Sequence, residues 1–480
     1  MFHRRILPRL RQVLWSRLVP RVAVLPALSL CALAVVTAGQ SLPPTAQSNQ
    51  DNARQASAQS NVSTSIPAED WTSSFIDPAQ GSSSVDLVRR ALASNAELAA
   101  ARLDVERARA RLRQAGLRPN PSLDFEQTNG VFNSPGERNT SVGFALPLEL
   151  GGQRKSRIDL AQAEFVAAEA EVADRERRLV AEVRAAYAEA LAALRELSIT
   201  GQLNNLDVQT ARVVEARVSE GDAAPLELNL LRVEVDRLRA RRALVEGRLQ
   251  AALLRLSGLT GIPAGEPLRL REGLDAALLP APPASLEAAV EIALRMRPDL
   301  RLAALNEEVA QAGLRLARAQ GRLAMTAFTR YAQNQSTFDD TPIGVLTDRD
   351  KLFTYGVTIT LPIFNRNQGA KAEAETAIAQ AKQRRQFIEA VVRAEVASAY
   401  ARYQAAGRSI TTFEQGVIAR SNDNIQAIRA AYQIGAFRVT DLLNEQRRLV
   451  DAQREYTEAL AERYRALADL QAALGVTVNP

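Results

Sequence analysis

GVTITLPIFNRNQG, the stretch from Gly356 to Gly369, changes its pattern halfway along. From Phe353 to Ile363 the odd positions are all apolar and the even positions are small or polar, which is the two-residue period of a strand with one apolar face. A proline then removes a backbone donor, an Asn-rich turn follows, and a long region without proline comes after it. The pattern predicts a seam where a strand passes into a long helix, at Pro362, Asn365, Asn367 and Gly369.

A weaker copy of this stretch, VGFALPLELGGQ at Val142–Gln153, lies about 215 residues earlier in the chain. Each copy has a second strand-like segment upstream, near Ser122–Asn129 and near Arg322–Gln335. The sequence therefore predicts four strands, in pairs at about residues 122–148 and 322–364, each of roughly the ten residues that cross a bilayer when tilted. The seam residues of the earlier copy are Pro147, Gly151 and Gly152.

The two copies belong to a duplicated module. SVDLVRRALASNAELAAARLDVERARARLRQA at Ser84–Ala115 resembles SLEAAVEIALRMRPDLRLAALNEEVAQAGLRLARA at Ser285–Ala319, and each begins with a serine suited to cap a helix. After each pair of strands comes a long helical region, broken once near a glycine. We expect an irregular N-terminal segment at 39–83, a first structural repeat at 84–260, a Pro- and Gly-rich connector at 261–284, a second structural repeat at 285–476 and a tail at 477–480.

Residues 1–38 have the pattern of an export signal. They contain six arginines and no acidic residue, and the uncharged stretch of 17 residues from Val22 to Ala38 ends in small side chains. This pattern predicts a signal peptide that is cleaved after Ala38. Two alternatives stay open: a single membrane anchor, for which the apolar stretch is short, and lipidation of Cys31 in the sequence LSLC.

Composition excludes several classes of function. The chain has a net charge of +6, and the six leader arginines account for all of it, so the remainder has no basic footprint for nucleic acid. The one histidine, His3, and the one cysteine, Cys31, both lie in the leader. Disulfides, thiol nucleophiles, Ser-His-Asp catalysis and metal sites with N or S ligands are therefore excluded beyond it. No acid pair stands out for carboxylate catalysis, so we predict no enzyme, no catalytic residue, no metal ligand and no cofactor.

The predicted helices are long and carry a narrow apolar stripe. From Gln368 to Gln433 there is no proline, and the stripe is of the coiled-coil kind. Strands whose apolar face meets lipid must have closed edges, and four strands are too few, because about eight are the practical minimum for a barrel. The sequence therefore predicts an oligomeric barrel continued by helices. The alternative is a soluble periplasmic coiled-coil scaffold without a pore, in which two hairpins cover a core.

The chain resembles the TolC-type outer-membrane efflux factors, and among them the CzcC-like branch, over about Ser84–Val476. The resemblance rests on the duplicated order of three segments: LPIFNRNQG at Leu361–Gly369, LPLELGGQRKSRIDLAQAE at Leu146–Glu164 and GAFRVTDLLNEQRRLVDAQREY at Gly435–Tyr456. It implies a mainly helical fold with membrane β-structure, in which a homotrimer forms one twelve-stranded outer-membrane β-barrel and a helical tunnel, an α-barrel, crosses the periplasm. It also implies docking to a periplasmic adaptor and an inner-membrane resistance-nodulation-division pump.

The resemblance further assigns the helix turns near Gly221 and Gly435 to the periplasmic tip, which would meet the adaptor and narrow to an acidic gate. The matching tip residues here are Gly221, Asp222, Gly435 and Ala436, and the matching gate residues are Asp441, Asn444 and Glu227. A ring of like carboxylates would attract cations and respond to pH and divalent ions. The alternative for Asp441 and Glu227 is that they are first-turn acids favoured by the helix dipole.

The expected function is a passive export duct in the outer membrane of a Gram-negative cell. The CzcC-like resemblance favours divalent cobalt, zinc or cadmium as cargo, and a duct for drugs or solvents is the alternative. The expected partners are two further copies of the chain, the adaptor, the pump and outer-membrane lipid.

Overall fold

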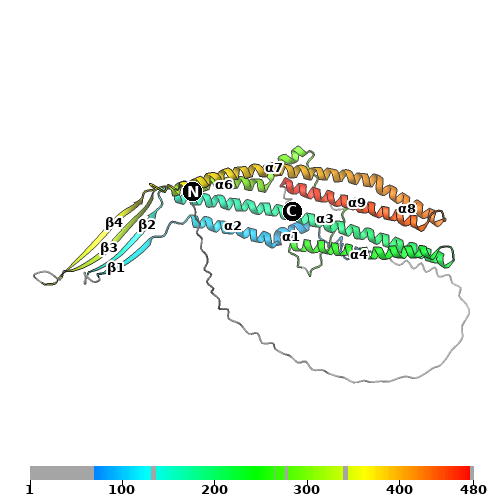
Figure 1. The fold of residues 1–480 in the computed structure, drawn as a ribbon, viewed down its shortest axis with the longest axis horizontal. Helices are drawn as coiled ribbons and strands as arrows, with labels where there is room; N and C mark the ends of the chain where they lie inside the picture. Colours follow the sequence, from blue (N-terminus) through cyan, green and yellow to red (C-terminus); the bar gives the residue numbers. More distant parts are fainter. Residues whose placement is uncertain (1–69, 131–136, 264, 276–278, 339–343, 476–480) are drawn as a thin grey trace, which may run out of the picture. The chain divides into compact units, whose positions relative to one another are not determined.

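The computed structural model describes residues 70–130, 137–263, 265–275, 279–338 and 344–475 (Figure 1). The expected signal peptide, Cys31 and the tail at 477–480 lie outside this range. The elements are α1 (Ser84–Ser94), α2 (Ala96–Ala115), β1 (Ser122–Asn129), β2 (Arg138–Leu148), α3 (Gln153–Ser219), α4 (Pro225–Thr260), α5 (Leu286–Met296), α6 (Pro298–Gln320), β3 (Ala324–Phe338), β4 (Leu346–Thr360), α7 (Gln368–Thr412), the π-helical turn η1 (Phe413–Val417), α8 (Ile418–Gln433) and α9 (Val439–Leu474).

The predicted duplication of the fold is confirmed. Each half runs through two short helices, two strands and two long helical segments in the same order. Helix α3 has 67 residues, which is about 100 Å at 1.5 Å per residue. Its counterpart in the second half is not continuous, because five residues around Gly416 form a π-helical turn between α7 and α8. The sequence pattern predicted a long helix from Gln368 to Gln433 with Gly407 and Gly416 as weak breakers, and the π-helical turn lies at the second of these glycines.

The four predicted strands are confirmed, and one antiparallel sheet contains them in the order β1-β2-β3-β4. Strand β2 of the first half pairs with β3 of the second, so the two halves share the sheet. Strand β4 begins at Leu346, earlier than its apolar pattern suggested, because the charged segment Leu346–Lys351 pairs with β3 although its sequence has the composition of a loop. It ends at Thr360 rather than Ile363, where a tight turn bonds the Ile363 amide to the Leu361 carbonyl at 2.9 Å.

The register places most of the large apolar side chains of the sheet on one face. Phe125 pairs with Val142, Val142 with Tyr331 and Tyr331 with Phe353, which makes one continuous row across the four strands. Strand alternation puts residues two apart on the same face, and the rings of Phe353 and Tyr355 lie 6.4 Å apart. These side chains are exposed, with Tyr355 at 78%. This apolar face comprises Leu123, Phe125, Val142, Phe144, Tyr331, Phe353, Tyr355, Val357 and Ile359.

The opposite face of the sheet is mostly small and polar, and Phe328, Leu346 and Leu352 are its large apolar members. A Cβ added to Gly356 would lie 2.8 Å from the ring of Phe328, so the ring lies over the glycine on this face. Arg330 reaches Glu126 at 3.8 Å and passes close to Gly143. We refer to this side as the polar face.

A strap formed by residues 70–83 binds the connector against the helices of the first half. Backbone bonds join Asp77 to the Leu270 carbonyl at 2.8 Å and the Leu270 amide to Phe75 at 2.9 Å. Trp71 is 5% exposed, packs against Gly201 of α3 and belongs to the largest apolar cluster, which includes residues of α1, α3, α4 and α9. The strap therefore belongs to the main core, and its backbone is irregular, with turns and isolated bridges from Ile76 and Ser82 to Leu270.

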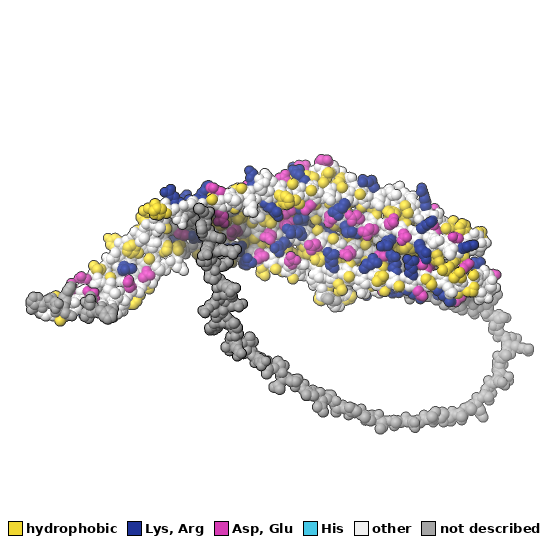
Figure 2. Space-filling model, viewed as in Figure 1, with side chains coloured by type: hydrophobic (Ala, Val, Ile, Leu, Met, Phe, Trp, Pro, Cys, Tyr) yellow, Lys and Arg dark blue, Asp and Glu magenta, His cyan; other side chains and the backbone are white. Residues whose placement is uncertain are grey.

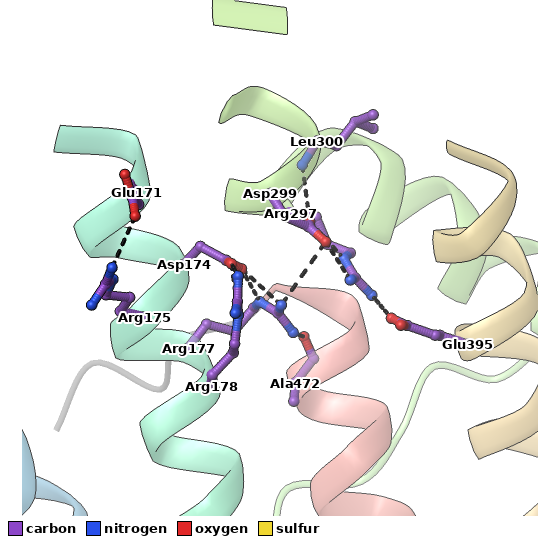
Figure 3. A network of polar contacts seen from close by, with 10 residues as sticks. All are labelled: Glu171, Asp174, Arg175, Arg177, Arg178, Arg297, Asp299, Leu300, Glu395 and Ala472. Atoms are coloured by element: carbon purple, nitrogen blue, oxygen red, sulfur yellow. Dashed lines mark hydrogen bonds and ion pairs between the residues drawn. The ribbon is translucent and has the colours of Figure 1, made fainter. Parts of the chain in front are cut away.

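An arginine-rich network joins the two halves near the end of α9 (Figure 3). Arg177 of α3 donates to the carbonyl oxygen of Ala472 at 3.2 Å and lies 3.9 Å from Asp299 of α6. Arg297, which caps α6 and is 3% exposed, binds both Asp299 and Glu395 of α7. Burial alone would raise the pKa of Asp299, but the hydrogen bonds and charge of Arg297 hold that pKa below its usual range. The buried charges here are thus paired.

Candidate functional site

The two turns between the long helices have the same backbone geometry. Gly221 and Gly435 both adopt the left-handed conformation, with φ of +84° and +79°. In the first turn the Asp222 amide bonds to the carbonyl five residues earlier at 2.8 Å, and in the second the Ala436 amide does so at 2.8 Å. This is a Schellman motif, in which glycine avoids the steric cost that other residues pay at this position. The two predicted tip turns are therefore structurally equivalent.

One apolar cluster holds the two turns together. Its buried members come from α3, α4, α8 and α9: Val214, Leu228, Leu231, Tyr432, Val439, Leu442 and Leu443. The structure thus brings the tip residues predicted from both halves, Gly221, Asp222, Gly435 and Ala436, to the ends of helices that pack against one another. Beside them Leu226, Ile434 and Phe437 are exposed, with Ile434 at 82%. We call these turns and their exposed apolar residues the tip.

Glu227 connects the two hairpins. It lies in the first turn of α4 and accepts a hydrogen bond from the Tyr432 hydroxyl of α8 at 3.2 Å. Arg217 of α3 lies 5.5 Å from the centre of the Tyr432 ring. Burial, followed by the charge and hydrogen bond of Glu227, raises the pKa of Tyr432, so this hydroxyl stays protonated as a donor. Two helix ends from different halves are therefore locked by one polar contact.

Asp441 and Asn444 lie on α9. Asp441 is half-buried in the first turn, and its carboxylate accepts the Arg438 backbone amide at 3.1 Å, which is the cap that the helix-dipole alternative expects. Asn444 lies almost one turn further on and is exposed. Asp441 and Asn444 lie at the start of α9, after the second turn, whereas Glu227 lies at the start of α4, after the first turn. The hydrogen bond from Tyr432 to Glu227 links the two turns.

A buried polar layer farther along the helices was not predicted. It comprises Asn204 and Asp207 of α3 and Gln446 of α9, which are 6%, 3% and 4% exposed. The amide atoms of Gln446 and one oxygen each of Asn204 and Asp207 have no hydrogen-bond partner among the described residues. Burial, then the charge of Glu234 on α4, raises the pKa of Asp207 to about 6, against smaller opposing effects of Gln446 and Arg429. We call these three residues the polar layer.

A signal for the polar layer exists in the sequence. Asn204 and Asp207 occupy positions on the same helix stripe as buried Thr200 and Val214, at spacings of three, four and seven residues. Polar residues at stripe positions mark a buried polar contact. These polar positions are hard to recognise in the sequence, because α3 has so many charged residues that its buried stripe is narrow.

The seam residues lie where the sheet meets the helices. Gly152 and Asn367 precede α3 and α7 and both adopt the left-handed conformation, with φ of +80° and +58°. Asn365 accepts the amide of Asn367 at 3.0 Å, and the Asn367 side chain donates to Ala317 at 2.9 Å. These contacts anchor the turn to α6.

The remaining seam residues also lie between the strands and the long helices. Pro147 lies in β2 opposite Thr326, while Pro362 follows the end of β4. The Gly151 carbonyl accepts a bond from Arg322 at 3.0 Å, and Gly369 lies in the first turn of α7 with open space beside it. The two halves thus pass from strand to helix through different side chains.

Among the described residues, no group of three His, Cys, Asp or Glu side chains could hold a metal ion. The described helices include none that is both long and apolar enough to cross a membrane. Charged side chains of both signs are scattered over the helices (Figure 2).

Comparison with known proteins gives a consistent picture. The sequence matches the family described as "Outer membrane efflux protein" over residues 87–262 and 289–476. It is 25% identical to the cobalt-zinc-cadmium resistance protein CzcC of Cupriavidus metallidurans, covering 80% of this chain and 88% of that protein. It is 26% identical to the pyoverdine export outer membrane protein OpmQ of Pseudomonas aeruginosa, covering 81% and 84%.

The fold is also that of a solved structure. A crystal structure of CusC, from a study of its folding and transmembrane channel formation, superposes with a TM-score of 0.69 at 23% identity, over 86% of this chain and 95% of the other. The resemblance predicted from the seam and tip segments is confirmed, as is a location in the outer membrane of a Gram-negative cell. Because the family model matches both halves of the chain, and the fold agrees with that of CusC, the chain belongs to the outer membrane efflux protein family.

Proposed function

We propose that three copies of this chain form a passive export duct, with twelve strands closing one barrel in the outer membrane and the long helices continuing it as a tunnel through the periplasm. The observation that carries the proposal is the sheet. Its apolar face is exposed, and β1 and β4 are its outer edges. Lipid cannot hydrogen-bond to strand edges, so β4 of one copy must pair with β1 of the next. A scaffold in water would gain nothing from such a face.

Divalent metal cations are the proposed cargo. In the proposed barrel the polar face lines the lumen, and its described residues include four acids, Asp124, Glu126, Asp348 and Asp350, and one base, Arg330. An excess of carboxylates in a pore favours cations over anions. Similarity to a relative named for cobalt, zinc and cadmium resistance points the same way. The similarity to a pyoverdine exporter supports the competing candidate, export of an organic compound.

The tip is the proposed docking site for a periplasmic adaptor, which would connect the duct to an inner-membrane pump. Its exposed apolar residues Leu226, Ile434 and Phe437 suit contacts with the apolar face of helices on a partner. The seam residues are proposed to manage the change from barrel to tunnel. We also propose that the signal peptide is cleaved after Ala38. The two structural repeats of the duct would then span residues 84–260 and 285–476.

Deletion of the gene tests the cargo. We expect lower tolerance of zinc, cobalt or cadmium, restored by the wild-type chain expressed from a plasmid. A second plasmid with Asp124→Asn and Glu126→Asn should restore it only in part, because the lumen would lose two carboxylates per chain. Unchanged metal tolerance together with new sensitivity to organic compounds would replace metals by an organic cargo.

Absence of any conductance in planar bilayers would exclude the duct itself.

Asp441 is the proposed gate residue, with Asn444 and Glu227 beside it. Because a ring of carboxylates binds divalent cations, millimolar divalent ions should block conductance from the periplasmic side. Asp441→Asn should raise the blocking concentration about ten-fold, the equivalent of about 1.4 kcal/mol. Asn444→Asp adds a second carboxylate one turn away and should lower it. Single-channel recording checks both. Equal block in the two variants would assign Asp441 to capping α9 alone.

A further inference from the structure

Beyond the aromatic row of the apolar face, the sheet separates its charges by sign. Arg349 and Lys351 precede Phe353 by four and two residues and therefore share its face. The register joins Arg349 to Gln335 and Gln335 to Arg138, so Arg138 lies on this side too. The intervening acids, Asp348 and Asp350, point to the polar face. We call Arg138, Arg349 and Lys351 the basic fringe.

Among the residues that the structure describes, the basic fringe has no carboxylate partner. All three residues are exposed. The one ion pair of the sheet among the described residues joins Arg330 to Glu126 on the polar face. Arg138 donates instead to the neutral amide of Gln127, whose oxygen accepts its guanidinium at 3.0 Å. An uncompensated cationic group thus borders a surface that is otherwise apolar.

The position of the fringe along the strands indicates what it meets. Strand β4 ends at Thr360, from which the chain enters α7, so its first residues lie at the end of the sheet away from the helices (Figure 1). At about 3.3 Å per residue, Lys351 and Arg349 lie roughly 7 and 13 Å beyond Phe353. Aromatic rows mark the membrane interface in outer-membrane barrels. The fringe therefore lies at the level of lipid headgroups on the side opposite the helices.

We propose that the basic fringe binds the phosphate groups of an anionic glycolipid in the outer leaflet of the outer membrane. This inference rests on the proposed function, which places the apolar face in lipid and the helices in the periplasm. Arginine binds phosphate through two parallel hydrogen bonds. The backbones of Arg138 and Arg349 lie two strand spacings apart, about 10 Å. A headgroup with two phosphates can engage both arginines at once.

The test uses the purified full-length protein in detergent. A glycolipid with two phosphates, the same glycolipid after dephosphorylation, and inorganic phosphate are each titrated, and bound lipid is counted by native mass spectrometry. The variant combines Arg138→Gln, Arg349→Gln and Lys351→Gln. The matched control combines Asp348→Asn and Asp350→Asn, which alter the same end of β4 on its other face.

We expect the wild type and the control to retain the bisphosphorylated glycolipid, and the triple variant to bind it at least about ten-fold more weakly. The dephosphorylated glycolipid should bind weakly to all three proteins. Equal retention by the triple variant, or by the dephosphorylated glycolipid, would overturn the proposal. So would full competition by equimolar inorganic phosphate, because the fringe would then be a site for the free anion.

Two further measurements separate this inference from the proposed duct. The triple variant should form the same oligomer as the wild type and conduct in planar bilayers, since its changed residues lie outside the lumen. Loss of lipid binding with normal conductance supports the fringe and leaves the duct intact. Normal conductance with unchanged lipid binding overturns the fringe alone. A wild type that neither oligomerises nor conducts removes the duct and, with it, the orientation on which the fringe depends.

Discussion

Replacing Val357 by arginine should prevent assembly in the outer membrane, whereas the same replacement at the neighbouring Thr358 should allow it. Val357 is 52% exposed on the apolar face, pairs with Ala327 and lies four residues, about 13 Å along β4, from Phe353 of the aromatic row. An arginine on the lipid side of a barrel costs about 2–4 kcal/mol near the bilayer midplane. In a symmetric trimer that cost recurs in each copy. Thr358 points to the polar face, where an added cation meets the water of the lumen.

Membrane fractionation and heat-modifiable electrophoresis measure this difference. Val357→Arg should lower the amount of assembled oligomer by at least ten-fold, and Thr358→Arg should leave it near the wild-type level. The Thr358 variant should also reduce cation selectivity in planar bilayers, because it adds positive charge to the lumen. If both variants assemble equally well, the apolar face does not meet lipid and the barrel is incorrect.

Asp207→Asn should stabilise the helical part of the molecule at neutral pH and remove most of its pH dependence near pH 5. Burial, then the charge of Glu234, raises the Asp207 pKa from 3.8 to about 6. The folded protein therefore holds a proton that the unfolded chain has lost between these values. The stability associated with this proton is full below about pH 3.8 and is lost as the pH rises to about 6. At 1.36 kcal/mol per pKa unit, the loss is about 3 kcal/mol.

Thermal unfolding followed by circular dichroism, between pH 4.5 and 8, measures this change. The charged groups around Asp207 are few: Glu234 on α4, which is paired with Arg447 of α9 at 3.0 Å, and Arg429 on α8. Asp236→Asn is the matched control, because Asp236 lies on α4 with a side chain 76% exposed. It should follow the wild-type profile. A melting temperature that depends on pH equally in the wild type and in Asp207→Asn would contradict a raised pKa.

Two acids of the helices show how far sequence alone can rank such residues. Asp299 is half-buried in the first turn of α6, and Arg297, which binds it, lies only two residues earlier in the sequence. Asp207 is buried in α3, and its surroundings are set by Gln446 of α9 and Glu234 of α4. The pairing of Asp299 can therefore be predicted from its sequence neighbours, whereas packing between helices decides the pKa of Asp207.

Local pattern served better for the sheet. The alternation from Phe353 to Ile359 was enough to identify an apolar face, because strand period and lipid exposure act on each residue separately. It failed for Leu346–Lys351, where pairing with β3 overrides a composition typical of loops. The seam was predictable from Pro362 and Asn367, since proline and left-handed geometry are local constraints.

The tip was predictable in its backbone and not in its side chains. Gly221 and Gly435 predict left-handed turns without any information from distant residues, and both adopt this conformation. The hydrogen bond between Glu227 and Tyr432 joins residues separated by 205 positions, and no spacing rule reaches that far.

The strap sets an order of events during folding. Its backbone partner Leu270 is almost 190 residues farther along the chain than Gly81, whose Cα has no room for a side chain against the Leu270 carbonyl. Closing so long a loop is entropically costly until α3 and α4 have formed a surface to receive it. Trp71, the one tryptophan among the described residues, enters its site under Arg242 in that step. Its fluorescence should therefore change late in refolding, after helix content has returned.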